Sequence, residues 1–322
     1  MFMSCGDALV DLFSHVASDG AERSPGEVAL NGHVGGSPLN VAVGLARLGN
    51  PAAYLCKNSS DFMGQRIAHY LRVNRVDTDY VVPTDLNSTL AMVQTNADGS
   101  ANYAFYTDNT ADVSLQINEL PNALPDELAV LNFASYSTAV DPTRSALLAL
   151  AQREQHQRVI AYDPNLRPSI EPDMDIWRES FAKFSDCASF LKASDEDIHT
   201  LMGSDTSLEN FATDAISSGV DVVVVTEGSE GATVYTSSGE RARSARIGID
   251  VVDTVGAGDT FQCASLHYLK AQGHVLGNKV NGDDIDLQVL VDFAATAAAI
   301  TCSRRGADLP TLAEVEASLA KK

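Results

Sequence analysis

Asp253-Thr-Val-Gly-Ala-Gly-Asp-Thr-Phe261 is the stretch of sequence that says most about the fold. It follows residues 247–252, which have an extended character, and it precedes an apolar helical pattern over residues 261–271 that Gly273 ends. A glycine-rich turn that leads into a helix presents backbone N–H groups without partners in the helix, and the helix dipole adds partial positive charge. The stretch therefore predicts an anion-binding site at the start of a helix.

Asp259 places a carboxylate inside this predicted anion site. A simple phosphate-binding turn has no use for a negative charge there. The carboxylate fits if it orients a hydroxyl group that attacks a phosphoryl group held by the N–H groups, as in phosphoryl transfer to an alcohol. The alternative, on these residues alone, is that Asp259 caps the helix and that the glycines serve only a tight turn.

A second glycine-rich stretch is Gly35-Gly-Ser-Pro-Leu-Asn-Val-Ala-Val-Gly-Leu-Ala-Arg-Leu-Gly49. Its first two glycines would let a ligand approach the backbone closely. Asn40 falls on the first turn of the predicted helix, where its amide can bond sugar hydroxyls. The same residues are equally compatible with a well-capped helix that binds no ligand.

The rest of the chain alternates strand-like apolar runs with helical patterns. The run of four valines at residues 222–225 is apolar throughout, as expected of a strand that is covered on both faces. Ser37-Pro38 and Asp141-Pro142 each predict a capping residue before a proline at the first helical position. The alternation predicts a doubly wound, mostly parallel α/β sheet with helices on both faces. Its expected strands are residues 3–12, 52–57, 128–133, 158–163, 188–191 and 221–226.

Two segments depart from this alternation. Residues 28–34 are short, extended and glycine-rich, and residues 89–107 alternate around Asp98-Gly99, which is a hairpin signal. We expect antiparallel strands inserted at about residues 12–34 and 85–110, forming a small β-sheet lid on a single α/β domain that spans residues 1–322. The exposed edge of such a lid would allow two copies of the chain to pair as a homodimer.

Composition excludes several classes of function. The 22 basic and 43 acidic residues of the 322 give a net charge of −21, which disfavours binding to nucleic acid or to an anionic membrane surface. Five cysteines without CxxC spacing argue against a disulfide framework or a zinc site. The sequence has neither a P-loop nor a dinucleotide fingerprint. The first residues lack a basic region and no apolar run is long enough to span a bilayer, so we expect a cytoplasmic protein.

Together the two glycine-rich stretches resemble the N-terminal and C-terminal signatures of the PfkB (ribokinase-like) family of carbohydrate kinases. The resemblance covers nearly the whole chain, from Cys5-Gly-Asp-Ala-Leu-Val-Asp11 to the region of residues 303–306. It implies a ribokinase-like fold with a β lid, ATP and Mg²⁺ as cofactors, and transfer of a phosphoryl group to a sugar hydroxyl.

The resemblance also implies roles for individual residues. Asp259 corresponds to the catalytic base, and the anion hole corresponds to Gly256, Ala257 and Gly258. The implied sugar contacts are Asp11, Gly35, Gly36, Asn40 and Arg167. The implied nucleotide contacts are Lys192, Thr226, Gly228 and Gly231. For the residues after the valine run, a plain strand-to-loop transition is the alternative.

Two cation sites are implied in the same way. Ser194 and Asp197 stand where the family usually shows an asparagine followed three residues later by a glutamate, near magnesium and phosphate. Magnesium accepts both as oxygen ligands, directly or through water, but the pair equally suits a helix N-terminus with Ser194 as the cap. The family also often has a monovalent-cation site near its C-terminal signature, which makes Asp253 a candidate for K⁺ together with Val255 and residues 303–306.

Four strings resemble the fructokinase branch of the family, and the third also resembles one found in 2-keto-3-deoxygluconate kinases. They are GDALVDLF at residues 6–13, YAFYTDNTADVSL at 103–115, DPNLRP at 163–168 and TCSRRGA at 301–307. We therefore expect ATP-dependent phosphorylation of D-fructose to fructose 6-phosphate. The alternatives are a 2-keto-3-deoxygluconate kinase, whose substrate carries a carboxylate and needs a further cation, a kinase for another sugar, and a sugar-binding sensor without catalysis.

Overall fold

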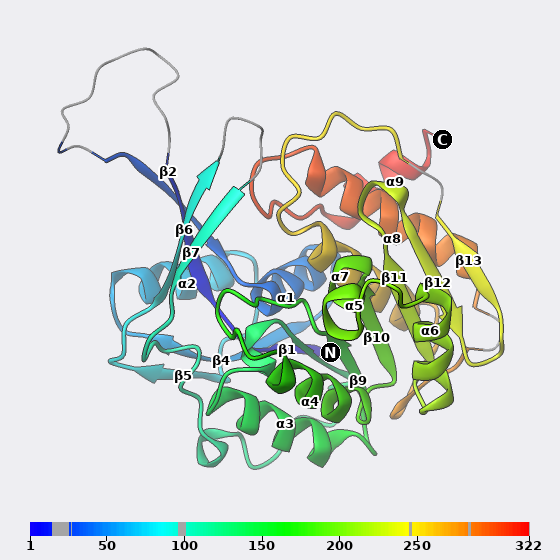
Figure 1. Ribbon diagram of the computed structural model, residues 1–322, viewed down its shortest axis with the longest axis horizontal. Coiled ribbons are helices and arrows are strands. Elements are labelled where there is room, and N and C mark those ends of the chain that lie inside the picture. Colours follow the sequence, from blue (N-terminus) through cyan, green and yellow to red (C-terminus); the bar gives the residue numbers. More distant parts are fainter. Residues whose placement is uncertain (15–25, 27, 96–100, 245–246, 283–284, 322) are drawn as a thin grey trace.

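A nine-stranded sheet forms the centre of the molecule (Figure 1). The computed structural model describes residues 1–322 except 15–25, 27, 96–100, 245–246, 283–284 and 322. The strand order is β13-β12-β11-β10-β9-β8-β1-β4-β5. The strands β11, β10, β9, β8, β1, β4 and β5 run parallel to one another, while β12 and β13 are antiparallel additions at one edge. The predicted mostly parallel α/β sheet is thus confirmed.

The run of four valines shows why the central strands are apolar throughout. In β11, Val222 and Val224 point into the core on one face of the sheet, and Val223 and Val225 point into the core on the other. Both faces are covered, so neither set of side chains meets water. The strands of the large sheet are β1 Phe2–Cys5, β4 Ala52–Ser59, β5 Val81–Thr84, β8 Val130–Ala134, β9 Val159–Asp163, β10 Phe190–Ser194, β11 Val222–Thr226, β12 Ala232–Thr236 and β13 Arg241–Arg243.

Helices cover both faces of the large sheet. One apolar core packs the sheet against α1 Ser37–Arg47, α7 Ala257–Ala271, α8 Leu287–Cys302 and α9 Leu312–Leu319. The opposite core packs it against α3 Thr143–Glu154, α4 Met174–Ser185, α5 Asp195–Met202 and α6 Leu208–Ser217. A third cluster holds α2 Phe62–Val73 against α1 and β4. In the part of the chain that the structure describes, none of the helices combines the length and the apolarity that crossing a membrane requires.

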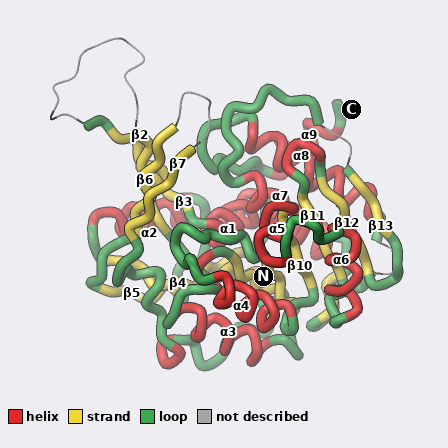
Figure 2. The backbone as a smooth tube through the Cα atoms, in the orientation of Figure 1, coloured by secondary structure: helices red, strands yellow, loops and turns green. Residues whose placement is uncertain are grey.

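A small four-stranded sheet stands away from this body at the upper left of Figures 1 and 2. Its order is β3-β2-β6-β7. The β2–β3 and β6–β7 pairs are antiparallel as expected, but β2 and β6 run parallel, so the sheet is mixed. The predicted turn at Asp98-Gly99 lies outside the described residues. The strands are β2 Leu9–Ser14, β3 Leu30–Gly35, β6 Thr89–Thr95 and β7 Ala101–Tyr106, and a separate hairpin pairs β14 Val275–Leu276 with β15 Lys279–Val280.

The expected single strand over residues 3–12 is wrong. The chain leaves the large sheet after Cys5 and enters the small sheet at Leu9. Gly6 makes the bend with a φ of 141°, and a Cβ at this position would lie 2.3 Å from the hydroxyl oxygen of Ser137. Because apolar residues flank the bend on both sides, the segment has the pattern of one continuous strand, and Gly6 is the residue in the sequence that indicates the bend.

Two of the predicted helix caps are also wrong. The N-cap of α1 is Gly36 and not Ser37, whose hydroxyl contacts another helix. The N-cap of α3 is Pro142 and not Asp141. Asp141 still accepts hydrogen bonds from the backbone and hydroxyl of Ser145, so its carboxylate stabilises the first turn from one position further out.

The stretch of residues 253–261 and the residues before it differ from the expectation in two respects. Helix α7 begins at Ala257, four residues before the predicted start, because Gly256 adopts the left-handed conformation and serves as the N-cap. Residues 247–252 form no strand. The end of α1 is as predicted, since Gly49 follows the helix with a φ of 87°.

Candidate active site

Two predicted site residues, Ser194 and Thr226, lie at the carboxyl edge of the large sheet beside Asp163. Asp163, Ser194 and Thr226 are the last residues of the neighbouring strands β9, β10 and β11. The N-termini of α1 and α7 meet at the same place, because side chains of α1 contact Asp259 of α7. Ligands of open parallel α/β sheets bind outside the carboxyl ends of the strands.

Asp259 lies at the third position of α7 and is almost fully buried. Its Oδ1 accepts a hydrogen bond from the Ser37 hydroxyl at 2.6 Å, and its Oδ2 accepts one from the Asn40 amide at 2.8 Å. Asn40 Oδ1 is buried without a hydrogen-bond partner. The amide of Asn40 therefore orients the carboxylate and keeps its own oxygen available to accept a bond from a ligand hydroxyl.

Burial and polar contacts act on Asp259 in opposite directions. Burial raises the pKa of its carboxyl group above the usual range, while the hydrogen bonds from Ser37 and Asn40 and the charges of Lys192 and Arg167 lower it. The pKa of Asp259 is thus raised while its ionised form keeps defined partners, which is the tuning expected of a candidate general base.

The backbone before Asp259 approaches its neighbours closely. Gly256 has a φ of 79°, and a Cβ there would lie 2.7 Å from the Cβ and 3.0 Å from the Cα of Ala307. The Thr260 hydroxyl donates to the carbonyl of Gly256 at 2.8 Å. A side chain at 256 would strain the turn and displace Ala307, so the glycine keeps the first N–H groups of α7 in position to face an anion.

Asp253 ties the turn before α7 to the loop after α8. Its carboxylate accepts hydrogen bonds from the backbone N–H groups of Val255 at 3.0 Å and Gly306 at 2.8 Å. The N–H groups of Val252 and Asp253 both donate to the carbonyl of Cys302. The residues named for a monovalent cation therefore lie together, and their present contacts hold the turn that precedes Asp259.

On the opposite side of the site, Asp11 and the glycine pair belong to the small sheet and its link to α1. Asp11 Oδ2 would lie 2.5 Å from a Cβ at Gly35, so a side chain there would displace this carboxylate from its present position. A Cβ at Gly36 would lie 2.5 Å from the carbonyl oxygen of Asp7. The two glycines thus allow the small sheet to bring Asp11 next to the start of α1.

Burial raises the pKa of Asp11 to about 7, although Arg167 lowers it, and the charges of Asp253 and Asp259 raise it further. Arg167 donates to the carbonyls of Asn165 and Leu166 and to the Asn165 amide oxygen. Its charge also acts on Asp259. The charges of Arg167 and Asp259 thus act on Asp11, as expected if the three side chains belong to one site.

Lys192 is a residue of β10, and its side chain reaches the glycine turn at residues 256–258, which is the candidate anion-binding turn (the anion turn below). Its ammonium group donates to Asp163 Oδ2 at 2.6 Å, and both side chains are almost fully buried. A Cβ at Gly258 would lie 3.5 Å from Lys192 Nζ, which places this cation directly beside the first turn of α7. Burial raises the pKa of Asp163, and Lys192 lowers it. The pair brings a positive charge to the position where a phosphoryl group would approach.

The other predicted nucleotide residues follow β11. Thr226 ends this strand and pairs with Ser194 of β10 and Ala232 of β12. Gly228 and Gly231 bound a short helical turn with positive φ angles of 53° and 101°. These three residues therefore form a turn at the carboxyl edge of β11, one strand away from Lys192.

Ser194 and Asp197, the predicted magnesium ligands, make hydrogen bonds to each other and to the backbone. Ser194 caps α5, and its hydroxyl donates to Asp197 Oδ2 at 2.7 Å. The other oxygen, Asp197 Oδ1, accepts the backbone N–H of Leu166 at 2.9 Å. Among the described residues, no cluster of three or more His, Cys, Asp or Glu side chains could hold a metal ion. An ionised carboxylate has about four acceptor sites, so these contacts leave lone pairs for a cation, and ligation of magnesium by Ser194 and Asp197, directly or through water, stays a prediction.

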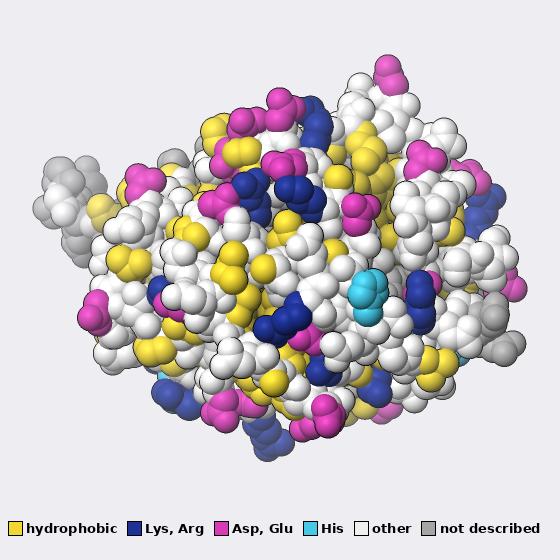
Figure 3. All heavy atoms as spheres, turned by 90° about the horizontal axis from the view of Figure 1, so that it is seen from below, with side chains coloured by type: hydrophobic (Ala, Val, Ile, Leu, Met, Phe, Trp, Pro, Cys, Tyr) yellow, Lys and Arg dark blue, Asp and Glu magenta, His cyan; other side chains and the backbone are white. Residues whose placement is uncertain are grey.

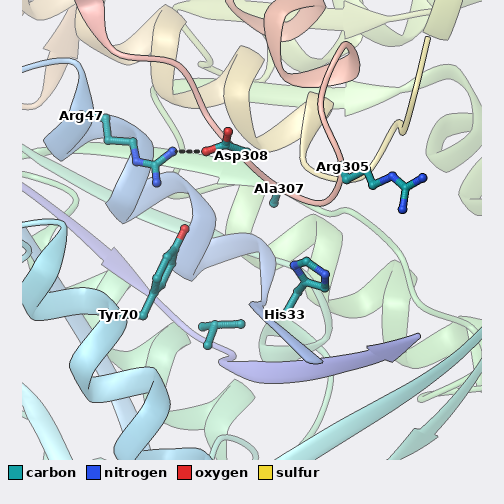
Figure 4. Close-up of a pocket in the computed structure, with 7 residues that line it drawn as sticks. His33, Arg47, Tyr70, Arg305, Ala307 and Asp308 are labelled. Atoms are coloured by element: carbon teal, nitrogen blue, oxygen red, sulfur yellow. Dashed lines mark hydrogen bonds and ion pairs between the residues drawn. The ribbon is translucent and has the colours of Figure 1, made fainter. Parts of the chain in front are cut away.

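A polar pocket of about 200 Å³ lies behind the anion turn (Figure 4). Arg47 and Asp308 form an ion pair of 2.7 Å across one side of it, and the Arg305 side chain points away from them. Its wall includes Ala307, the residue that packs against Gly256.

The surface agrees with the acidic composition. On the face shown in Figure 3, Lys and Arg side chains are interspersed with Asp and Glu, and no continuous basic area covers the part that is described.

Sequence reasoning missed two members of the site. Ser37 was expected to cap α1, and Asp163 had no assigned role beyond its place in the DPNLR string. The signal for Ser37 was the glycine pair before it, since a glycine can itself be the N-cap. The pairing of Asp163 with Lys192 has a weaker signal, namely an acid and a base at the ends of adjacent predicted strands.

Comparisons with known proteins agree with this architecture. The model of the pfkB family of carbohydrate kinases matches residues 1–314. The chain is 32% identical to a probable fructokinase-4 of Arabidopsis thaliana over 99% of this chain and 96% of that protein.

Two solved structures are similar throughout. A fructokinase from Xylella fastidiosa with bound ATP superimposes with a TM-score of 0.88 at 23% identity, over 99% of this chain and 98% of that one. A double mutant of a fructokinase from Vibrio cholerae O395, with fructose, ADP and a potassium ion bound, gives 0.84 at 24%, over 99% and 97%. At these identities the structural likeness establishes the fold.

Proposed function

This chain belongs to the pfkB family of carbohydrate kinases, and we propose that it transfers the γ-phosphoryl group of ATP to a hydroxyl of D-fructose, giving fructose 6-phosphate. The coarser activity, ATP-dependent phosphorylation of a sugar, follows from the family. The observation that carries the residue assignments is Asp259, a buried carboxylate held by two donors in the first turn of a helix that begins with glycine.

In the proposed reaction the sugar lies between the start of α1 and the small sheet. Asp11 accepts hydrogen bonds from sugar hydroxyls, and Asn40 Oδ1 accepts another. The reacting hydroxyl faces Asp259, which takes its proton as the oxygen attacks the γ-phosphorus atom and the bond to the ADP oxygen breaks. The phosphoryl group gains one bond to the sugar and loses one to ADP, and the proton ends on Asp259.

The transferring phosphoryl group carries negative charge that needs stabilising. In the proposal, the backbone N–H groups at Gly256, Ala257 and Gly258 donate to its oxygens, and the Lys192 ammonium lies beside them. Donors that are fixed before the reaction cost no reorganisation during it. Thr226, Gly228 and Gly231 are our candidates for contact with the nucleotide, and the small sheet would exclude water from the closed site.

Cations enter the proposal in two ways. ATP reacts in kinases as its magnesium complex, which neutralises phosphate charge. Asp253 is our candidate for holding a monovalent cation, because its carboxylate joins the two loops behind the anion turn. Turnover in potassium chloride against an equal concentration of tetramethylammonium chloride tests this, and equal rates would remove the cation from the proposal.

The substrate is tested by ADP release with ATP, magnesium and a panel of sugars. The panel contains fructose, ribose, tagatose, adenosine and 2-keto-3-deoxygluconate. We expect saturable turnover with fructose well above the others. Preference for the keto acid would keep the mechanism and change the substrate, while binding of fructose by calorimetry without turnover would favour a sensor.

The base is tested by Asp259→Asn. We expect the variant to keep the fold and to bind sugar, while turnover falls roughly 10²-fold or more, because general base catalysis contributes that much. An asparagine has nearly the same shape, and its amide oxygen can accept from Asn40 while its NH2 group donates to the Ser37 oxygen, so the variant removes the charge and keeps two polar contacts. Near-normal turnover would remove Asp259 from the mechanism.

A further inference from the structure

The Ser37 hydroxyl is not used by its own helix. Ser37 is the first residue of α1, and the N-cap before it is Gly36, which has no side chain to offer. Glycine is required there because of its φ of 113° and because a Cβ would approach the carbonyl oxygen of Asp7 to 2.5 Å. Pro38 follows and has no N–H group to be capped. The Ser37 side chain is therefore free to contact another element.

That contact is with Asp259, 222 positions away in the sequence. The Ser37 hydroxyl donates to Oδ1 at 2.6 Å, and both residues are buried, with exposed fractions of 6% and 7%. Asn40 lies three residues after Ser37, on the same side of the helix, and donates to Oδ2. One turn of α1 thus holds both oxygens of the carboxylate.

We propose that Ser37 is a positioning residue for the phosphoryl transfer, whose hydroxyl fixes the Asp259 carboxylate so that its remaining lone pairs face the reacting sugar hydroxyl. The inference rests on the proposed role of Asp259 as the base. An ionised carboxylate has about four acceptor sites, so the bonds from Ser37 and Asn40 leave room for the substrate. Without Ser37, Oδ1 would be buried with one donor fewer and the carboxylate would be free to rotate.

Charged and titratable groups surround this carboxylate on several elements. Lys192 of β10 and Arg167 of the loop after β9 favour its ionised form. Asp163 of β9 and Asp11 of β2 carry charges that interact unfavourably with it. Cys263 of α7 is a buried thiol whose pKa is raised, so it stays neutral.

Among the contacts that favour the carboxylate, the bond from Ser37 has the largest effect in lowering the pKa of Asp259. Removing it should shift the base toward its protonated form, and the loss of activity should therefore be greatest at acid pH. A merely structural serine would lower activity by the same factor at every pH.

The test compares Ser37→Ala with Ser37→Thr, which keeps a hydroxyl, and with Ser265→Ala. Ser265 is a fully buried serine of α7 whose hydroxyl bonds the carbonyl of Phe261, so its variant controls for the loss of a buried hydroxyl. For Ser37→Ala we expect kcat to fall roughly tenfold at pH 6 and less at pH 8.5, since a bond to a charged acceptor is lost. The KM for ATP should stay unchanged, and Ser37→Thr should recover most of the loss.

A double variant shows whether Ser37 acts through the base. In an Asp259→Asn background, Ser37→Ala should lower the residual turnover by less than twofold. A further tenfold loss there, or a pH profile of Ser37→Ala that runs parallel to the wild type, would overturn the inference.

A measurement without turnover separates this inference from the proposed function. In ligand-free protein with ¹³C-labelled aspartate carboxyl carbons, the Asp259 signal is assigned by its loss in Asp259→Asn. Its titration midpoint should move to higher pH in Ser37→Ala and stay in place in Ser265→Ala. If no sugar is turned over, the proposed function fails while this shift still tests the contact. An unmoved midpoint would contradict the positioning role.

Discussion

Replacing Asp7 with asparagine should make the protein more stable at pH 8 relative to the wild type. Asp7 lies in the bend between the two sheets, has an exposed fraction of 1%, and neither of its carboxylate oxygens has a hydrogen-bond partner. The nearby Ser137 hydroxyl donates to the carbonyl of Ala134 instead. An ionised carboxylate in this position has lost its water without gaining donors in exchange.

The magnitude follows from the pKa. Burial raises the pKa of Asp7 from 3.8 to about 7, and the charge of Asp112 raises it too. The folded protein therefore keeps a proton that the unfolded chain has already released, so the free energy of unfolding falls as pH rises from about 4 to 7 and then levels off. Between pH 5 and pH 8 this one group should cost the wild type about 3 kcal/mol of stability.

Urea unfolding at pH 5 and pH 8 measures this difference. In Asp7→Asn the site no longer titrates. From pH 5 to pH 8 its free energy of unfolding should therefore fall by about 3 kcal/mol less than that of the wild type. Asp205→Asn, at an exposed acid, should follow the wild type. The reasoning is refuted if Asp7→Asn and the wild type show the same dependence on pH.

Three further changes test the site. Gly256→Ala should lose about 1–3 kcal/mol of stability, because Gly256 has a left-handed φ and a Cβ there would press against Ala307. In the control Gly258→Ala the new Cβ would lie 3.5 Å from Lys192 Nζ, an ordinary contact, so this variant should unfold at the same or a higher urea concentration, and equal stability losses would contradict the packing argument. Asn40→Ala should raise the KM for the sugar more than that for ATP in steady-state assays, and an equal rise would argue against a sugar contact. Lys192→Met should destabilise the protein by about 3–5 kcal/mol at pH 8, because it leaves a buried charge on Asp163 without a partner, and by less at pH 5, where Asp163 can take up a proton. Urea unfolding should show that adding Asp163→Asn recovers stability, and a loss that is equal at both pH values would contradict the pairing.

The sequence predicted the parts of the fold that local pattern determines. The four valines of β11 indicate a strand that is buried on both faces, whatever lies next to it. Gly49 ends α1 because the left-handed conformation is a property of the residue itself. The glycines before Asp259 likewise predicted a turn into a helix without any knowledge of the neighbouring elements.

The structural predictions that proved wrong concern residues whose conformation depends on contacts with distant parts of the chain. The apolar run around Gly6 looks like one strand, and only the large sheet on one side and the small sheet on the other divide it. Ser37 before a proline has the local pattern of a cap, but the structure uses its hydroxyl for Asp259, and no spacing rule links two residues so far apart. The parallel pairing of β2 with β6 depends in the same way on how the chain returns to the small sheet.

The charges around the proposed sugar site bear on which substrate it can take. The charge of Arg167 acts on three buried or half-buried carboxyl groups, those of Asp7, Asp11 and Asp259. A substrate with its own carboxylate would have to share this guanidinium with them and would meet their repulsion once they are ionised. A neutral sugar brings hydroxyl donors, and a donor is what the buried Asn40 Oδ1 lacks. If the proposed sugar site is right, it should favour a neutral sugar over a keto acid, and this preference should grow as pH rises through 7 and more of these carboxyl groups become charged.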